Sequence, residues 1–386
     1  MLPRERVETT LQFEEPDFVP WGEHSIDYTT YEMVLGRKSF VQGKIHKTKA
    51  LWEGRRDDVV ESYRRDIPDL AEALGFDIIT VGTVPVEGYN PRPMEQVDHE
   101  TYRNERGDLY RVSATTEQLM PYKINTDDWE APTVEDYQEQ IDRIIEEGVP
   151  RPDESQWEAA RHIIETMQDR YWINTCMADI NYPRIGPTEE LRFLNIAAHP
   201  ELHEKAVELE ARQRIGSLKY YAEVGYDSVM PCGDLGSSTG LLCRPDIIKE
   251  HVLPWWKKFT AEAHRLGLHI IKHCCGNIWE ALDYIVEGGY EGYEGIQASG
   301  TMDMKRLKEE YGDRLVLWGG VKNESLIGGT PEDVTEDARY AIKWGAPGGG
   351  FIYGASHSLA VGTKPENLEA MKASRERWGA YPIDVP

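Results

Sequence analysis

From about residue 155 onward, short apolar runs alternate with longer amphipathic stretches of helical period, and this alternation constrains the fold most strongly. Such a cadence is typical of parallel strands joined by crossover helices. Six apolar runs follow one another in this part of the chain: 171–177, 227–232, 268–274, 292–297, 314–321 and 349–355. Two earlier runs, PDFVPW (16–21) and DIITVG (77–82), bring the number to eight. Eight strands alternating with helices predict a (β/α)8 TIM barrel.

Residues at the helix boundaries agree with this interpretation. The stretch 200–225 opens with Pro200 and closes with Gly225, and a later stretch opens with Pro331 and closes with Gly345. Proline fits the first helical turn, whereas glycine is typical of the residue that ends a helix. The sequence therefore predicts helices between the strands.

One segment departs from the α/β pattern. QVDHETYRNERGDLYRVSATTE (96–117) has the alternation of a β-hairpin, with a glycine-containing turn at Glu105–Asp108. We interpret it as an insertion in the N-terminal half that lies over one end of the barrel. Because barrels of this kind use about 250 to 400 residues as one unit, we expect 1–386 to form a single domain.

Composition excludes several classes of function. The chain has 43 Lys and Arg against 68 Asp and Glu, a net charge of -25, which would repel nucleic acids and anionic membranes. The first thirty residues contain charges throughout, and the chain has no apolar run of about 18 residues. We expect a soluble, cytoplasmic protein. The five cysteines, two of them adjacent, favour buried thiols or metal ligands over a disulfide framework.

The pair His273 and Cys275 is the strongest candidate for chemistry. Side chains alternate along a strand, so these two residues face one side and Cys274 faces the other. Gly276 marks the carboxyl end of the strand, where parallel barrels build their active sites. An imidazole beside a thiolate favours zinc. The alternative is a buried histidine packed beside buried cysteines.

Two further strand ends carry polar side chains. Cys232 and Asp234 end one strand, and the Asp234 carboxylate suits contact with substrate or with its proton, although aspartate also caps loops. His357 follows the last strand and could be the third zinc ligand, leaving one position open. Alternatively, His357 hydrogen-bonds substrate or backbone, and Cys232 is the third ligand.

Four motifs, in this order, resemble the uroporphyrinogen decarboxylase superfamily. The resemblance covers roughly residues 170 to 375 and implies a TIM barrel with its pocket at the carboxyl ends of the strands, commonly in a homodimer. The motifs are DSVMPCGDLGSSTGLLCRPD, HCCGNIWEALDYIVEGG, LWGGVKNESLIGGTPEDV and GASHSLAVGTKPEN.

The superfamily contains two chemistries. Its decarboxylases carry an arginine-rich N-terminal motif for the substrate carboxylates, where this chain has VPWGEHSIDYTT (19–30) with no arginine. Its cobamide-dependent methyltransferases bind zinc through His-x-Cys and a later cysteine. His273 and Cys275 match the first two ligands, whereas His357 stands where the second cysteine is expected.

The resemblance therefore favours a zinc-dependent methyltransferase that works with the corrinoid (cobalamin) of a partner protein. The substrate would be a methyl ether such as a methoxylated aromatic, methanol, a methylamine or a thiol, with a preference for O-demethylation. Zinc would be bound by His273, Cys275 and His357, and Asp234 would be catalytic. We expect substrate contacts from Cys232, Gln297, Trp21 and His24.

Two other functions are compatible with the same sequence. A metal-free decarboxylase of the uroporphyrinogen type would use Asp234 to stabilise a protonated pyrrole. A barrel retained as a binding subunit would have no activity, because a fold does not dictate function.

Overall fold

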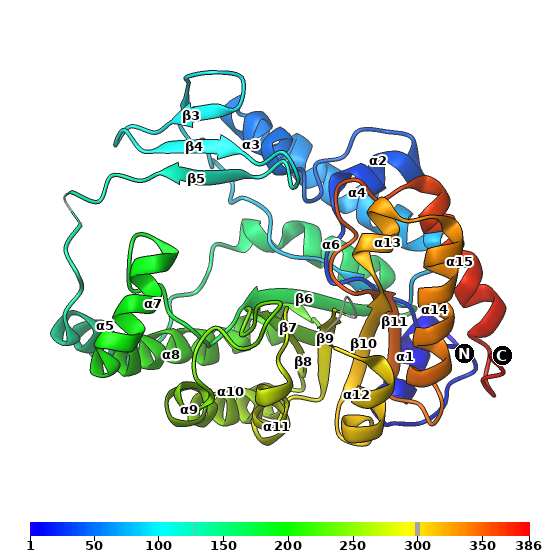
Figure 1. Ribbon diagram of the computed structural model, residues 1–386. Coiled ribbons are helices and arrows are strands. Elements are labelled where there is room, and N and C mark those ends of the chain that lie inside the picture. Colours follow the sequence, from blue (N-terminus) through cyan, green and yellow to red (C-terminus); the bar gives the residue numbers. More distant parts are fainter. Residues whose placement is uncertain (128, 298–301) are drawn as a thin grey trace.

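A computed structural model of the chain describes residues 1–127, 129–297 and 302–386, and Figure 1 shows its elements. In the described residues, seven parallel strands form a curled sheet in the order β1-β6-β7-β8-β9-β10-β11. Each strand overlaps an apolar run from which the sequence predicts a strand. The strands are β1 (Ile78–Thr80), β6 (Trp172–Ala178), β7 (Ser228–Cys232), β8 (His269–His273), β9 (Gly292–Ile296), β10 (Val316–Val321) and β11 (Phe351–Ala355).

The segment 16–21, the eighth candidate strand, fills the gap between β11 and β1. Trp21 forms a parallel bridge with Tyr353 of β11, and its carbonyl accepts the N–H groups of Asp77 and Ile78 at 2.7 and 3.3 Å. Pro20, which has no N–H to donate, contributes only its carbonyl, to Tyr353 N at 2.8 Å. This segment therefore connects the two edges of the sheet through a few bonds, and the TIM-barrel prediction is confirmed.

Helices surround the barrel, as the sequence predicts. Helix α8 begins at Pro200 and stops before Gly225, and helix α14 begins at Pro331. The helices are α1 (Pro3–Leu11), α2 (Tyr28–Leu35), α3 (Lys44–Trp52), α4 (Arg56–Leu74), α5 (Val134–Glu147), α6 (Glu158–Met167), α7 (Glu189–Ala198), α8 (Pro200–Val224), α9 (Pro245–Ile247), α10 (Leu253–Arg265), α11 (Leu282–Glu287), α12 (Met304–Tyr311), α13 (Asn323–Gly328), α14 (Pro331–Gly345) and α15 (Pro365–Trp378). Short helical turns lie at η1 (Glu154–Trp157), η2 (Ile248–Val252) and η3 (Trp279–Ala281).

Two apolar clusters hold these layers together. The larger lies between the sheet and the surrounding helices. The smaller fills the barrel, with Ile271 of β8, Met230 of β7 and Trp318 of β10 packed together, and Val7 of α1 joins it. Because side chains alternate along a strand, His273 and Cys232 point to the same side as Ile271 and Met230, toward the barrel interior.

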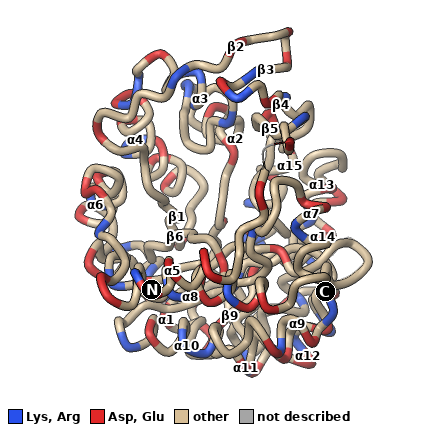
Figure 2. The backbone as a smooth tube through the Cα atoms, turned by 90° about the vertical axis from the view of Figure 1, so that its left-hand side faces the viewer, with Lys and Arg blue, Asp and Glu red and all other residues tan. Residues whose placement is uncertain are grey.

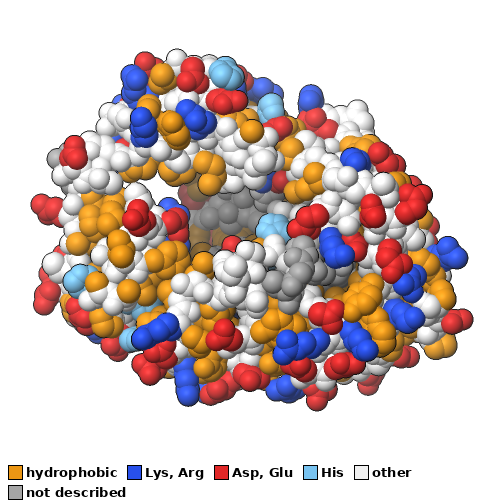
Figure 3. Space-filling view, viewed as in Figure 1, with side chains coloured by type: hydrophobic (Ala, Val, Ile, Leu, Met, Phe, Trp, Pro, Cys, Tyr) orange, Lys and Arg blue, Asp and Glu red, His pale blue; other side chains and the backbone are white. Residues whose placement is uncertain are grey.

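The predicted hairpin is present and belongs to a larger insertion. Strands β3 (Thr101–Arg103) and β4 (Leu109–Val112) form the hairpin, and β2 (Glu95–Gln96) and β5 (Leu119–Lys123) extend it to an antiparallel sheet. In Figure 1 this sheet lies above the barrel, and Figure 3 shows the molecule hollowed between them. The insertion thus overhangs the end at which the parallel strands finish.

Charged residues of both signs are spread along the chain. Figure 2 shows Lys and Arg interspersed with Asp and Glu along the chain and not gathered into a stripe. Among the described residues, no helix combines the length and the apolar character that crossing a bilayer requires.

Candidate metal centre

A buried carboxylate joins two histidines at the carboxyl end of the barrel. Glu294 of β9 is 1% exposed; one of its oxygens contacts His273 Nδ1, and Oε1 lies 3.0 Å from His24 Nδ1. The two imidazole rings are 4.3 Å apart between centroids. Because Glu294 occupies both Nδ1 atoms, the Nε2 atom of each histidine is left for another partner.

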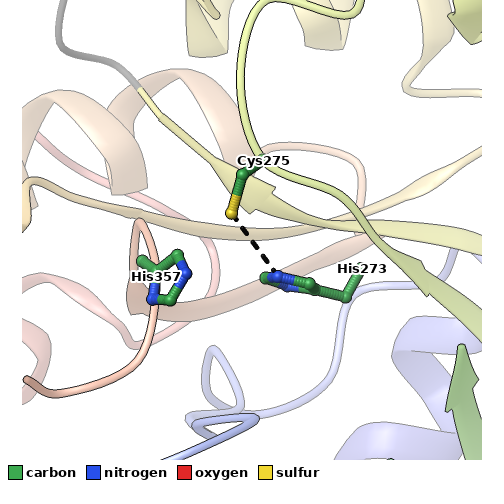
Figure 4. Close-up of side chains that lie close together, drawn as sticks. All are labelled: His273, Cys275 and His357. Atoms are coloured by element: carbon green, nitrogen blue, oxygen red, sulfur yellow. Dashed lines mark hydrogen bonds between the residues drawn. The ribbon is translucent and has the colours of Figure 1, made fainter. Parts of the chain in front are cut away.

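Cys275, two residues after His273, and His357, from the segment after β11, both approach His273, as Figure 4 shows. Cys275 Sγ lies 3.5 Å from His273 Nε2. His357 follows β11, and its ring centroid is 5.5 Å from that of His273. One ligand atom from each of the three side chains lies within 4.8 Å of the others. The structure thus brings together the three residues for which the sequence predicts metal binding.

The loop that carries Cys275 is held by neighbouring loops. Asp234, exposed at the end of β7, accepts the N–H of Cys275 at 3.0 Å, and Gln297 Oε1 accepts the N–H of Gly276 at 2.9 Å. Gly276 has a φ of +89°, and a Cβ there would lie 2.4 Å from the Gly236 carbonyl carbon. Only glycine fits this turn, which directs Cys275 toward His273.

The cluster's electrostatics favour a bound cation. Burial raises the pKa of the Cys275 thiol, and the nearby carboxylates of Asp234 and Glu294 raise it further. Burial would lower the pKa of His273, but the attraction of Glu294 outweighs this and raises it. For Glu294, the attraction of the two histidines outweighs burial and lowers its pKa. A cation would supply the positive charge that a Cys275 thiolate needs here.

His357 differs electrostatically from His273. Burial, together with the nearby His24 and His273, lowers the pKa of His357 to about 4. Its Nδ1 accepts the N–H of Ser358 at 2.7 Å and lies 2.8 Å from Ser358 Oγ, so these hydrogen bonds engage Nδ1 and not Nε2. Metal binding through Nε2 would place the ring proton on Nδ1, which could donate it to Ser358 Oγ. A neutral imidazole with one free nitrogen is the form that binds metals.

A cavity of about 280 Å³ adjoins this cluster. Polar groups of Glu23, His24, Cys176, Cys232 and His273 line it beside the cluster. The rest of its wall is mainly apolar and aromatic, and among the described residues neither lysine nor arginine lines it. The lining beyond the cluster is Ser25, Ile26, Tyr31, Val41, Gln42, Tyr63, Ile67, Leu70, Ala71, Phe76, Ile78, Ile79, Thr80 and Gly82.

Of the residues predicted to contact the substrate or to act on it, two line the cavity and the others lie elsewhere. His24 and Cys232 line the cavity, whereas Gln297 supports the Gly276 backbone and Asp234 caps the Cys275 loop. Trp21 does not lie at the cavity. Its side chain is fully buried, packs against aromatic neighbours and donates to Glu23 at 2.9 Å, so the expectation that it contacts substrate finds no support.

Two buried charged residues beside the candidate ligands were not expected from the sequence. Glu294 lies in the apolar run 292–297, and Lys272 directly precedes His273; both are at most 1% exposed. The sequence did carry a signal for them, because each is a charged residue within a strand that is apolar on both faces. Charged groups are buried in such strands only when they have partners.

Zinc fits the donor set that this chain offers. One thiolate and two imidazoles are ligands that zinc accepts, and three protein ligands leave a position open. Glu294 behind His273 adds the carboxylate that commonly orients a ligating histidine. The alternative third ligand, Cys232, lies at the cavity but outside the group of three ligand atoms that the structure brings together.

Comparisons with known proteins agree with this architecture. Residues 190–378 match the family described as uroporphyrinogen decarboxylase (URO-D). A methyltransferase from Methanosarcina mazei has a similar structure, with a TM-score of 0.63 at 17% identity over 98% of this chain and 99% of that one. A 3-keto-D-glucoside 4-epimerase from E. coli, YcjR, has a TM-score of only 0.33 at 14% identity over 65% of this chain and 97% of that one.

No curated protein sequence matches the chain. The four motifs that carry the resemblance lie wholly within the matched residues, and the Methanosarcina structure has the same fold. The similarity to the uroporphyrinogen decarboxylase (URO-D) family thus covers residues 190–378, and the described chain folds as a TIM barrel.

Proposed function

We propose that this protein is a zinc-dependent methyltransferase that moves a methyl group between a small substrate and the corrinoid of a partner protein. One observation carries the proposal: His273, Cys275 and His357 converge beside a cavity at the carboxyl end of the barrel. The URO-D family domain and the fold shared with a methyltransferase support the same reaction class.

His273, Cys275 and His357 would hold the zinc ion. When bound, zinc would polarise the heteroatom of the methyl donor or acceptor as a Lewis acid. Glu294 holds the Nδ1 atoms of His24 and His273, and so directs the His273 Nε2 atom toward Cys275. Asp234, exposed at the mouth and bonded to the Cys275 backbone, would orient the substrate or hold its proton.

The cavity supports a small, largely uncharged methyl substrate. Its wall is rich in apolar and aromatic side chains, and no lysine or arginine among the described residues lines it. These features suit a methyl ether, including a methoxylated aromatic, better than a polycarboxylate; methanol, methylamines and thiols are the other candidates. The corrinoid would arrive on a separate protein, and we expect the enzyme to be a homodimer.

Methyl transfer to a corrinoid is the direct test. Purified protein, loaded with zinc, is mixed with reduced corrinoid and a series of methyl ethers, alcohols, amines and thioethers. Methylation of cobalt is followed by visible absorbance. We expect turnover with at least one donor, loss of turnover in Cys275→Ser, and wild-type turnover in Cys243→Ser, whose cysteine lines a different cavity.

A decarboxylase of the uroporphyrinogen type is the competing function, because the matching family carries that description. It predicts a metal-free protein that releases carbon dioxide from a porphyrinogen, with no dependence on Cys275. Such activity, together with no methyl transfer to any corrinoid, would overturn the proposal.

A further inference from the structure

Lys272 lies directly before His273 on β8 and is fully buried. Its side chain points to the opposite side of the strand from His273, away from the cavity. Its ammonium group donates to Asp179 Oδ2 at 2.6 Å, to the Gly233 carbonyl at 3.2 Å and to the His273 carbonyl at 3.3 Å. An ammonium group has three protons, and each has an acceptor here.

These three acceptors belong to three neighbouring strand ends. Asp179 directly follows β6, Gly233 directly follows β7, and His273 ends β8. The packing is tight, because a Cβ at Gly233 would lie 2.7 Å from Asp179 Cβ and 2.3 Å from Asn181 Nδ2. One buried cation therefore ties together the strand ends beneath the candidate metal centre.

Two further bonds extend this connection to a metal ligand. Asp234, the residue after Gly233, accepts the N–H of Cys275 at 3.0 Å. Leu235 donates its N–H to Cys274 Sγ at 3.2 Å. The loop that Lys272 holds through Gly233 thus holds, in turn, the loop that carries Cys275. A displaced Gly233 would displace Cys275 relative to His273.

We propose that Lys272 is a positioning residue for the metal centre, fixing the separation of His273 and Cys275 through the carbonyl groups of His273 and Gly233. The inference rests on the proposed function, because it assumes that these ligands bind a metal. Lys272 touches neither the cavity nor the ligand atoms. Replacing a buried ion pair by apolar residues often leaves stability unchanged, so the geometry of the site is the property expected to suffer.

Cobalt(II) binding tests this role, since the ion's visible spectrum reports ligand geometry. Lys272→Met alone leaves Asp179 buried without its partner, so the double variant Lys272→Met with Asp179→Leu is made as well. We expect the folded double variant to bind cobalt about 10 to 100-fold more weakly than wild type, with an altered spectrum. Arg375→Met is the matched control, because it breaks another buried pair, with Asp77, before β1 at the opposite end of the barrel.

Each outcome either supports or overturns the positioning role of Lys272. Wild-type affinity and spectrum in the folded double variant would overturn the positioning role while leaving the proposed function intact. If neither variant folds, the Lys272–Asp179 pair is required for the stability of the barrel, and the positioning role is overturned as well. Weakened cobalt binding in the double variant but not in Arg375→Met would support it. A wild-type protein that binds cobalt but transfers no methyl group would contradict the proposed function alone.

Discussion

Strand β8 carries a histidine at each end, and each histidine is paired with a glutamate from the chain around β9. At the amino end, His269 Nδ1 lies 2.8 Å from Glu291 Oε1; at the carboxyl end, His273 Nδ1 contacts Glu294. The side chain of His269 is 41% exposed and that of His273 is 7% exposed. The same two residue types thus meet in two different environments.

The two pairs differ most in the residues that surround them. At the amino end, Arg4 pairs with Asp227 at 2.6 Å, and these two charged residues line a polar, open hollow together with His269. At the carboxyl end, His273 faces a thiol, a second imidazole and a cavity. The exposed His269–Glu291 pair therefore acts as an ordinary surface ion pair. In the buried His273–Glu294 pair, the glutamate orients a histidine whose second ring nitrogen faces other potential metal donors.

Replacing each histidine by alanine should produce the largest difference in zinc content between the two ends of β8. In His273→Ala we expect zinc content to fall to background, a larger loss than the about 10 to 100-fold that removal of an outer partner costs. His269→Ala should keep full zinc content. Metal analysis of both dialysed proteins measures this, and equal zinc content in the two variants would abolish the distinction.

The glutamate partners should differ in the same direction. Glu294→Gln removes the charge that orients His273, so zinc affinity should fall about 10 to 100-fold. Glu291→Gln should leave zinc affinity unchanged. Competition with a chelator of known affinity measures both constants. An unchanged affinity in Glu294→Gln would mean that the carboxylate plays no part in metal binding.

Two glycines flank β8 and sharpen the comparison further. Gly267 has a φ of +79° and open space at its Cβ position, so Gly267→Ala should cost about 1 to 2 kcal/mol of unfolding free energy. Gly276→Ala should cost more and weaken zinc binding, because its Cβ would meet the Gly236 backbone. Urea unfolding and zinc titration check both variants. Weaker zinc binding in Gly267→Ala would contradict this assignment.

The smallest effect concerns pH and the amino-end pair. The hydrogen bond that His269 donates to the Glu291 carboxylate raises the pKa of His269 above 6.5. For Glu291, the same hydrogen bond and the charge of His269 outweigh burial and lower its pKa below 4.5. The pair therefore contributes its full stabilisation of the fold between about pH 4.5 and 6.5. This stabilisation is lost as the pH rises through the raised pKa of His269. His269→Ala should cost about 0.5 kcal/mol in that window and less at pH 8. Urea unfolding at both pH values tests this, and a cost that does not change would refute the linkage.

The sequence predicts most of the fold because strand ends, prolines and glycines act locally. The eighth barrel segment is less regular than expected, because Pro20 removes a donor from it. Trp21 was expected at the substrate, yet it lies on the buried side of that segment, and which side a short irregular segment presents cannot be derived from alternation alone.

The sequence predicts which side chains converge at the candidate site, but not the groups that support them. His273, Cys275 and His357 each lie at or after a strand end, so barrel topology brings them together. Glu294 and Lys272 lie within strands, and most of their partners come from segments far away in sequence. Only the three-dimensional register shows that Lys272 meets Asp179, 93 residues earlier.

Zinc K-edge X-ray absorption on the purified protein tests the central claim most directly, because it counts sulfur and imidazole ligands around the metal. The account predicts one zinc ion per chain with one sulfur and two imidazole ligands, and loss of the sulfur in Cys275→Ser. A metal-free protein, a shell without sulfur, or a shell with two sulfurs that includes Cys232 would contradict it.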